Sequence, residues 1–79
     1  MEYDKDKVDE MTLALLYLVT SRVQDGGRAW PGFDARTLER LEQRGWISAP
    51  KGKRAMSLEV TPEGMKKAEE LFRKHFQEE

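Results

Sequence analysis

The chain has no cysteine and a single histidine, His75, among its 79 residues. The lack of cysteine excludes disulfide bonds, thiolate catalysis and cysteine-ligated zinc. One histidine cannot form a histidine metal cluster within one subunit, so we expect neither a metal nor another cofactor. A domain this small has a limited core and often gains stability from a partner, so self-association is the expected source of further burial.

Long hydrophobic runs are also missing. The longest, Leu13 to Val19, falls far short of the roughly 20 residues that a membrane-spanning helix needs. Acidic and polar residues follow Met1, which is unlike a secretory signal. No internal repeat or low-complexity linker marks a domain boundary. We therefore expect one cytoplasmic domain over residues 1–79, with no membrane contact.

Charge is nearly balanced overall but unevenly distributed. Residues 28–54 contain seven cations and three anions, whereas the segments on either side are net acidic. A basic region of this kind is one signature of a nucleic-acid contact. An equally good interpretation is that charges of both signs simply solvate the surface.

A long first helix is predicted from Lys5 to Gln24, ended by Gly26. Its apolar residues recur at helical spacing and are expected to face the core. This stripe consists of Val8, Met11, Leu15 and Leu18, with Val19 at its edge. Leu13, Leu16 and Tyr17 lie beyond the stripe. A helix with one solvent-exposed face needs apolar residues only on its other face. This helix is therefore either sandwiched between other elements or paired with a second copy of itself.

The next segment, residues 28–30, is expected to be a short strand or an extended connector, because Pro31 turns the chain. Trp30 and Phe33 are predicted to anchor the core beneath that turn.

A second, short helix follows Asp34, whose carboxylate can cap the first backbone N–H groups. Leu38 and Leu41 give this helix its inner face. Gly45 can take the left-handed conformation that ends a helix, and Trp46 can then pack back on Leu41. These signals predict both ends of the helix.

A hairpin and a last helix complete the pattern. Residues 46–48 are predicted to pair with residues 55–60, where Met56, Leu58 and Val60 alternate with polar residues. Thr61 is the expected cap of the last helix. The buried stripe of that helix is predicted to be Met65, Ala68, Leu71, Phe72 and Phe76. The fold class is therefore α+β, with three helices and a sheet of two or three strands.

Residues 37–48, TLERLEQRGWIS, and 57–64, SLEVTPEG, resemble bacterial winged-helix proteins of the MarR and PadR type. The resemblance implies a winged-helix-like fold with a long first helix, a short middle helix, a β-hairpin wing and a C-terminal helix. The segment between Gly26 and Phe33 is too short for another helix, so the usual second helix is missing or reduced to a loop. The whole chain is also similar to a family of small uncharacterised bacterial proteins, a resemblance that supplies no function.

The winged-helix resemblance implies candidate nucleic-acid-binding residues on the middle helix and in the wing. The resemblance matches Arg36, Arg40 and Gln43 to the reading helix, and Lys51, Lys53 and Arg54 to the wing. Arg44, which the helical spacing directs largely outward, is a further candidate. Winged-helix dimers commonly meet through the first and last helices, which implies a homodimer interface. Its candidate residues are Leu13, Leu16, Tyr17, Phe72 and Phe76.

Catalysis is not expected. His75 has no acid or nucleophile at a readable spacing, and no glycine-rich phosphate loop or paired-carboxylate motif is present. We expect a non-enzymatic binding protein of bacterial type, acting as a homodimeric accessory or regulatory module through protein–protein contacts. The alternative is a DNA-binding transcriptional regulator that uses the Asp34–Arg44 helix and the Lys51–Arg54 wing.

Overall fold

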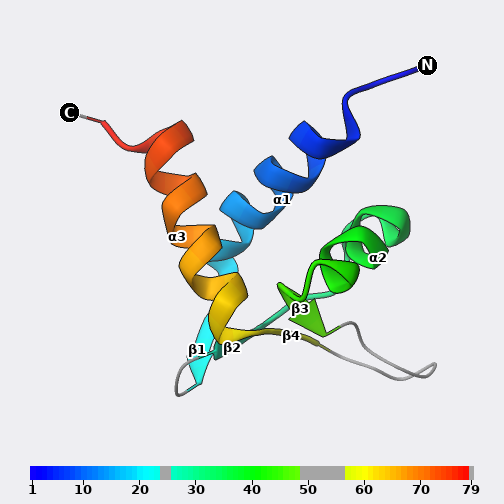
Figure 1. The fold of residues 1–79 in the computed structure, drawn as a ribbon. Coiled ribbons are helices and arrows are strands. Elements are labelled where there is room, and N and C mark those ends of the chain that lie inside the picture. Colours follow the sequence, from blue (N-terminus) through cyan, green and yellow to red (C-terminus); the bar gives the residue numbers. More distant parts are fainter. Residues whose placement is uncertain (24–25, 49–56, 79) are drawn as a thin grey trace.

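Three helices pack on one side of a small antiparallel sheet in the computed structural model, which describes residues 1–23, 26–48 and 57–78 (Figure 1). The elements are α1 (Lys5–Val19), β1 (Ser21–Val23), β2 (Gly26–Ala29), α2 (Ala35–Gln43), β3 (Ile47–Ser48), β4 (Leu58–Val60) and α3 (Pro62–Phe76). The fold class is α+β, as predicted.

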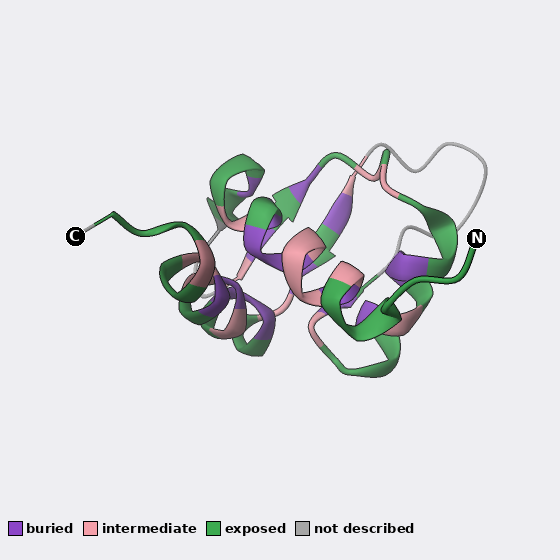
Figure 2. Cartoon of the chain, turned by 90° about the horizontal axis from the view of Figure 1, so that it is seen from above, coloured by how far each residue is buried: buried purple, intermediate pink, exposed green. Residues whose placement is uncertain are grey.

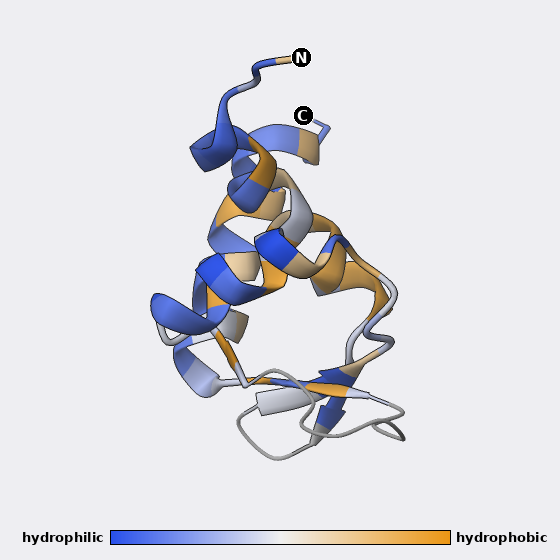
Figure 3. Ribbon diagram, turned by 90° about the vertical axis from the view of Figure 1, so that its right-hand side faces the viewer, coloured by the Kyte–Doolittle hydropathy of each residue, from blue (hydrophilic) through white to orange (hydrophobic). Residues whose placement is uncertain are grey.

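The sheet has four strands in the order β1-β2-β4-β3 within the described ranges, and every neighbouring pair is antiparallel. Leu58 and Val60 of β4 are buried while Glu59 between them is exposed, so β4 has the predicted period of two. Side views place the helices on one side of this sheet (Figure 3). The core lies between the two layers.

The first helix is shorter than predicted. It ends at Val19, and Thr20 takes an extended conformation that leads directly into β1. The Thr20 hydroxyl donates to the carbonyl of Leu16, and Ser21 pairs with Arg28 across the hairpin. Pairing of β1 with β2 therefore overrides the helical pattern of residues 20–24, and the prediction that Gly26 ends the helix is wrong.

The inward face of α1 also differs from the prediction. Leu13, Ala14 and Leu16 are fully buried, together with the carboxylate residue Asp9. The expected core stripe lies on the opposite side, with Leu15 46% and Leu18 65% exposed. Figure 2 shows that exposed residues occupy one side of each helix and buried residues the other.

The limits of α2 are as predicted. The Asp34 side chain accepts a hydrogen bond from the Thr37 amide at 3.0 Å. At the other end, Gly45 has φ of 77°, and the amides of Gly45 and Trp46 donate to the carbonyls of Glu42 and Leu41. These two bonds are a Schellman motif, which satisfies carbonyls that the helix leaves unpaired.

The start of α3 also matches the prediction. Thr61 caps the helix by accepting a hydrogen bond from the Gly64 amide at 3.0 Å, and its hydroxyl lies 2.7 Å from the carbonyl oxygen of Gly45. A Cβ at Gly64 would overlap the carbonyl of Trp46, so glycine is required for this close approach. Thr61 and Gly64 thus lock α3 onto the end of α2.

The connection from β2 to α2 contains no helix, as predicted. Phe33 in this connection packs against the core, but Trp30 is 70% exposed. The prediction that Trp30 anchors the core is therefore wrong. Its ring centroid lies 6.4 Å from that of Phe33, so Trp30 covers Phe33 from the outside.

Candidate interaction surfaces

An ion pair with a buried carboxylate joins α1 to α2. The carboxylate of Asp9 is fully buried and accepts hydrogen bonds from Nε of Arg40, at 2.8 Å to Oδ1 and 2.9 Å to Oδ2. Nη2 of Arg40 lies 2.8 Å from Oδ1. The Arg40 side chain is only 23% exposed. A bidentate guanidinium–carboxylate pair of this kind is geometrically specific, so it fixes how α2 sits against α1.

This ion pair continues into the cap of α2. Nη2 of Arg40 lies 3.1 Å from the Thr37 hydroxyl, and that hydroxyl donates to Asp34 at 2.9 Å. The hydrogen bonds from the side chain and amide of Thr37 lower the pKa of the Asp34 carboxyl, with help from the nearby Arg40 and Arg36 charges. Asp9, Arg40, Thr37 and Asp34 therefore form one connected chain of hydrogen bonds.

Arg44 makes a second, more exposed contact between the same helices. Its Nη2 lies 2.9 Å from Oδ1 of Asp6, and its guanidinium stacks 5.1 Å from the centroid of the Trp46 ring. Arg44 thus ties the start of α1 to the end of α2.

The predicted nucleic-acid-binding residues are therefore divided. Arg36 and Gln43 are exposed on the outer side of α2, as expected for a reading helix. Arg40 and Arg44 are held by carboxylates of α1 instead. Lys51, Lys53 and Arg54 lie outside the described residues. The described residues thus leave two of the four predicted helix positions open to a ligand.

The predicted dimer residues lie mainly inside the subunit. Leu13 and Leu16 are fully buried, so assigning them to an intersubunit surface is wrong. Tyr17, Phe72 and Phe76 form an aromatic row between α1 and α3, with successive ring centroids 5.2 and 5.4 Å apart. Because Tyr17 and Phe72 are half-buried in this row, they serve first to join α1 to α3.

An apolar surface that the sequence assigned to the core lies on the outside of α1. We call Val8, Met11, Leu15 and Leu18 the outer stripe. A shallow groove of about 440 Å³ runs along its N-terminal half, and three of the four stripe residues line it. The groove is lined by Tyr3, Asp4, Lys7, Val8, Met11, Thr12 and Leu15. The spacing of these residues was visible in the sequence, but it could not show which of two apolar faces is exposed.

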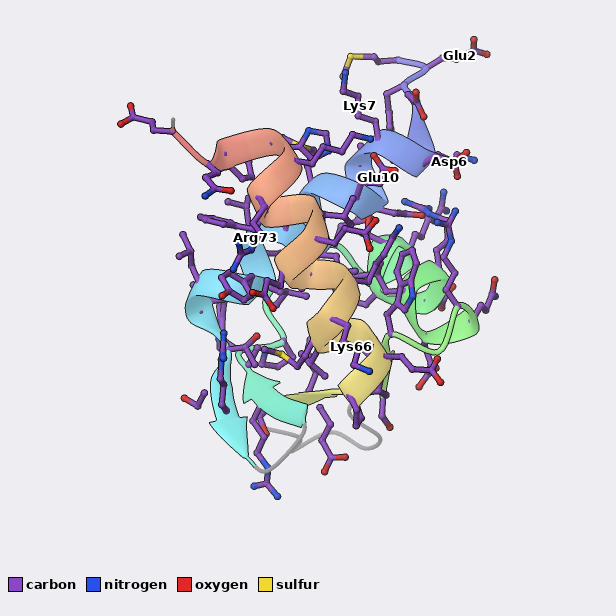
Figure 4. All side chains as sticks on the ribbon, turned by 60° about the vertical axis from the view of Figure 1, so that its left-hand side comes forward. Glu2, Asp6, Lys7, Glu10, Lys66 and Arg73 are labelled. Carbon is purple, nitrogen blue, oxygen red and sulfur yellow. The ribbon has the colours of Figure 1, made fainter. Side chains whose placement is uncertain are left out.

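A second groove, of about 380 Å³, lies between the end of α1 and the first half of α3. Arg22 stacks over the ring of Tyr17 at 5.2 Å in its wall. Lys66 and Glu69 line the other side, and Glu69 also pairs with Arg73 at 2.8 Å. Figure 4 shows Lys66 and Arg73 along α3. The groove is shallow and its charges are of both signs.

His75 lies beside the aromatic row. Its Nε2 is buried, 3.7 Å from Oε2 of Glu10 on α1, and has no hydrogen-bond partner in the described part of the chain. Residues 1–23, 26–48 and 57–78 contain no group of three or more potential metal ligands. None of the helices in these ranges is long and apolar enough to cross a membrane.

Together these features define a small α+β protein in which three helices cover one face of a four-stranded antiparallel sheet and one helix keeps an apolar outer side. The chain belongs to the family DUF6429, a domain of unknown function, which matches residues 4–78. It is 46% identical over 76 residues to the uncharacterized protein y4hR of Sinorhizobium fredii (strain NBRC 101917 / NGR234), covering 96% of this chain and 97% of that protein. No solved structure matches the chain. The expected similarity to small uncharacterised bacterial proteins is confirmed, while the winged-helix resemblance stays a prediction.

Proposed function

We propose that this protein is a non-enzymatic, winged-helix-like module of the bacterial cytoplasm, which acts as a homodimer through protein–protein contacts. The order of elements supports the winged-helix comparison. A helix comes first, α2 leads directly into the β3–β4 pair, and β2 joins that pair through β4. A binding role without chemistry also agrees with the exposed surfaces described above.

The outer stripe carries the proposal. Leu15 is 46% and Leu18 65% exposed, so the rest of the subunit leaves both side chains largely uncovered. Burying one leucine side chain contributes roughly 1.5–3 kcal/mol. A helix that leaves several such residues in water has a face suited to a protein partner.

Sedimentation of the purified protein tests this proposal. We expect a dimer in the micromolar range and a dissociation constant at least about 100-fold higher for the Leu15→Glu/Leu18→Glu variant, because charges would replace apolar contacts on both subunits. Lys66→Glu/Lys74→Glu, which changes the charge at two exposed positions of α3, is the control, and we expect it to leave the constant nearly unchanged. A wild-type protein that stays monomeric at high micromolar concentration would contradict the proposal.

DNA binding is the second candidate, favoured by the exposed positions of Arg36 and Gln43 on one helix. In a dimer these residues would be present twice. Arginine can read guanine in the major groove, and glutamine can read adenine. The pairing of Arg40 and Arg44 with α1 reduces the charge available to this surface.

A salt titration on duplex DNA tests this candidate. Four phosphate contacts would give a log–log slope of about −3.6 for the affinity against salt concentration. We expect Arg36→Glu, or Lys51→Glu with Lys53→Glu, to weaken binding, whereas Lys74→Glu on α3 serves as the control with the same charge change. Equal weakening by Lys74→Glu, or no retention at low salt, would reject a specific role for α2.

A further inference from the structure

The outer stripe has the spacing of a two-helix seam. Its four residues are separated by three, four and three positions, which repeats every seven residues. A helix with this repeat presents a narrow apolar line that suits one other helix packed at a shallow angle. The stripe thus favours a helix as partner over a sheet edge or a flexible peptide.

The charge around the stripe indicates which helix. Between Val8 and Val19 the only charged residues are Asp9 and Glu10. Asp9 is buried against Arg40, and Glu10 is directed to His75 of α3. The exposed side of this part of α1 is therefore uncharged. A neutral apolar stripe is complementary to itself, as the twofold interface of a homodimer requires. The charged residues of the adjoining groove, Asp4 and Lys7, are of opposite sign.

Further apolar residues lengthen this surface at both ends. A standard interface buries about 800 Å² per partner, which a helix about 22 Å long covers only in part. Tyr3, 51% exposed, precedes α1, and Trp30, 70% exposed, follows β2. Because Ser21 pairs with Arg28 in the antiparallel hairpin, Val19 and Trp30 leave the hairpin at the same end. Trp30 therefore lies at the end of the hairpin from which α1 also departs.

The ends of α1 differ in charge, and this difference sets the direction of pairing. The first two turns contain Lys5 and Lys7, and two of the three acids beside them, Asp6 and Asp9, pair with arginines of α2. The last turn has no basic residue to complement the negative end of its helix dipole. An antiparallel partner would bring its lysines to that end and would oppose the two dipoles. A parallel partner would bring the two charged N-terminal segments together.

Building on the proposed homodimer, we infer that two copies of this protein pair through their α1 helices in antiparallel orientation, with the outer stripes in contact. The twofold axis then passes at the level of Leu13. Met11 faces Leu15 of the second copy, and Val8 faces its Leu18. The groove beside Val8 receives that Leu18, and Tyr3 approaches Trp30 of the other subunit.

Disulfide cross-linking tests the orientation, because the chain has no cysteine of its own. A disulfide requires two Cα atoms within about 7 Å. In the antiparallel pair the two copies of residue 18 are about 15 Å apart along the helix axis, at 1.5 Å per residue. Leu18→Cys alone and Val8→Cys alone should therefore stay uncross-linked, whereas an equal mixture of the two variants should form a covalent dimer under mild oxidation.

Two controls are needed to interpret the cross-linking result. Lys66→Cys, at an exposed position on α3, mixed with Leu18→Cys should remain uncross-linked. Circular dichroism verifies that each variant keeps its helix content. Cross-linking of Leu18→Cys alone, or no product from the mixture of a protein that sediments as a dimer, would overturn the antiparallel seam and leave the homodimer proposal intact. A monomer in sedimentation would remove both.

Discussion

Helix α1 is held on two sides by different chemistry. Its contact with α3 is mainly apolar and includes the row of Tyr17, Phe72 and Phe76. Its contact with α2 centres on two ion pairs, Asp9 with Arg40 and Asp6 with Arg44. We call the α1–α3 contact the apolar seam and the α1–α2 contact the ionic seam. The apolar seam buries side chains without requiring one geometry, whereas the ionic seam is directional and fixes the position of α2.

The two seams should also fail differently. Removing apolar atoms lowers the free energy of unfolding roughly in proportion to the number of atoms removed. A buried ion pair adds little net stability, because desolvation offsets the attraction, but removal of one partner leaves an uncompensated charge. The comparison therefore predicts that the ionic seam is the more sensitive to single substitutions and the more tolerant of a matched double substitution.

The largest effect is expected from Arg40→Ala. It leaves the fully buried Asp9 without its partner, which should lower the free energy of unfolding by about 3–5 kcal/mol. Urea unfolding followed by circular dichroism measures this loss. Arg36→Ala, an exposed position one turn earlier on α2, is the control and should change the free energy by less than about 0.5 kcal/mol.

The double variant Asp9→Leu/Arg40→Leu sharpens the same comparison. Replacing both charges removes the unpaired carboxylate, so most of the stability lost in Arg40→Ala should return. If the double variant is as unstable as the single one, the seam depends on the hydrogen bonds to Thr37 rather than on the charge pair.

The apolar seam is tested by Leu71→Ala on α3. Leu71 is 2% exposed, and a substitution of this kind should cost about 3 kcal/mol through lost contacts and the cavity left behind. Lys74→Ala on the same helix is the exposed control. The loss in Leu71→Ala should be the same in low and high salt, and a strong salt dependence would show that charge also contributes to this seam.

Local signals predicted the parts of the fold that depend on neighbouring residues. Asp34 and Gly45 specify the ends of α2, and Thr61 with Pro62 specifies the start of α3. These devices act over three to five residues, so their geometry follows directly from the order of the residues. Leu38 and Leu41, which the helical period assigns to the inner face of α2, are buried as predicted.

The remaining features depend on contacts between distant residues. Asp9 and Arg40 are 31 residues apart, and no local pattern pairs them. Because α1 is apolar on two sides, its periodicity could not show that the side containing Asp9 is the buried one. The β1–β2 hairpin was missed for a related reason: residues 20–23 can extend a helix, and only the pairing of β1 with β2, which itself pairs with β4, favours the strand.

A smaller effect is expected at the exposed end of the ionic seam. Asp6 is 81% exposed, so Arg44→Ala should cost only about 0.5–1 kcal/mol from the ion pair and the contact with Trp46 together. A double-mutant cycle with Asp6→Ala measures the ionic part, which should nearly vanish at about 1 M salt because the screening length falls to about 3 Å. Coupling that persists in high salt would mean that this pair is better shielded than its exposure indicates.

The smallest effect concerns pH and the cap of α2. Hydrogen bonds from Thr37 lower the pKa of Asp34 in the folded protein, so between the lowered pKa and the ordinary value the unfolded chain binds more protons. The stabilisation is therefore fully present above about pH 4, the ordinary range of an aspartate, and is lost as the pH falls through the lowered pKa. Asp34→Asn keeps a capping oxygen but cannot titrate. The difference in unfolding free energy between wild type and Asp34→Asn should shrink as the pH falls from about 5 to 2, and a difference that stays constant over this range would show that the carboxylate charge does not contribute to the cap.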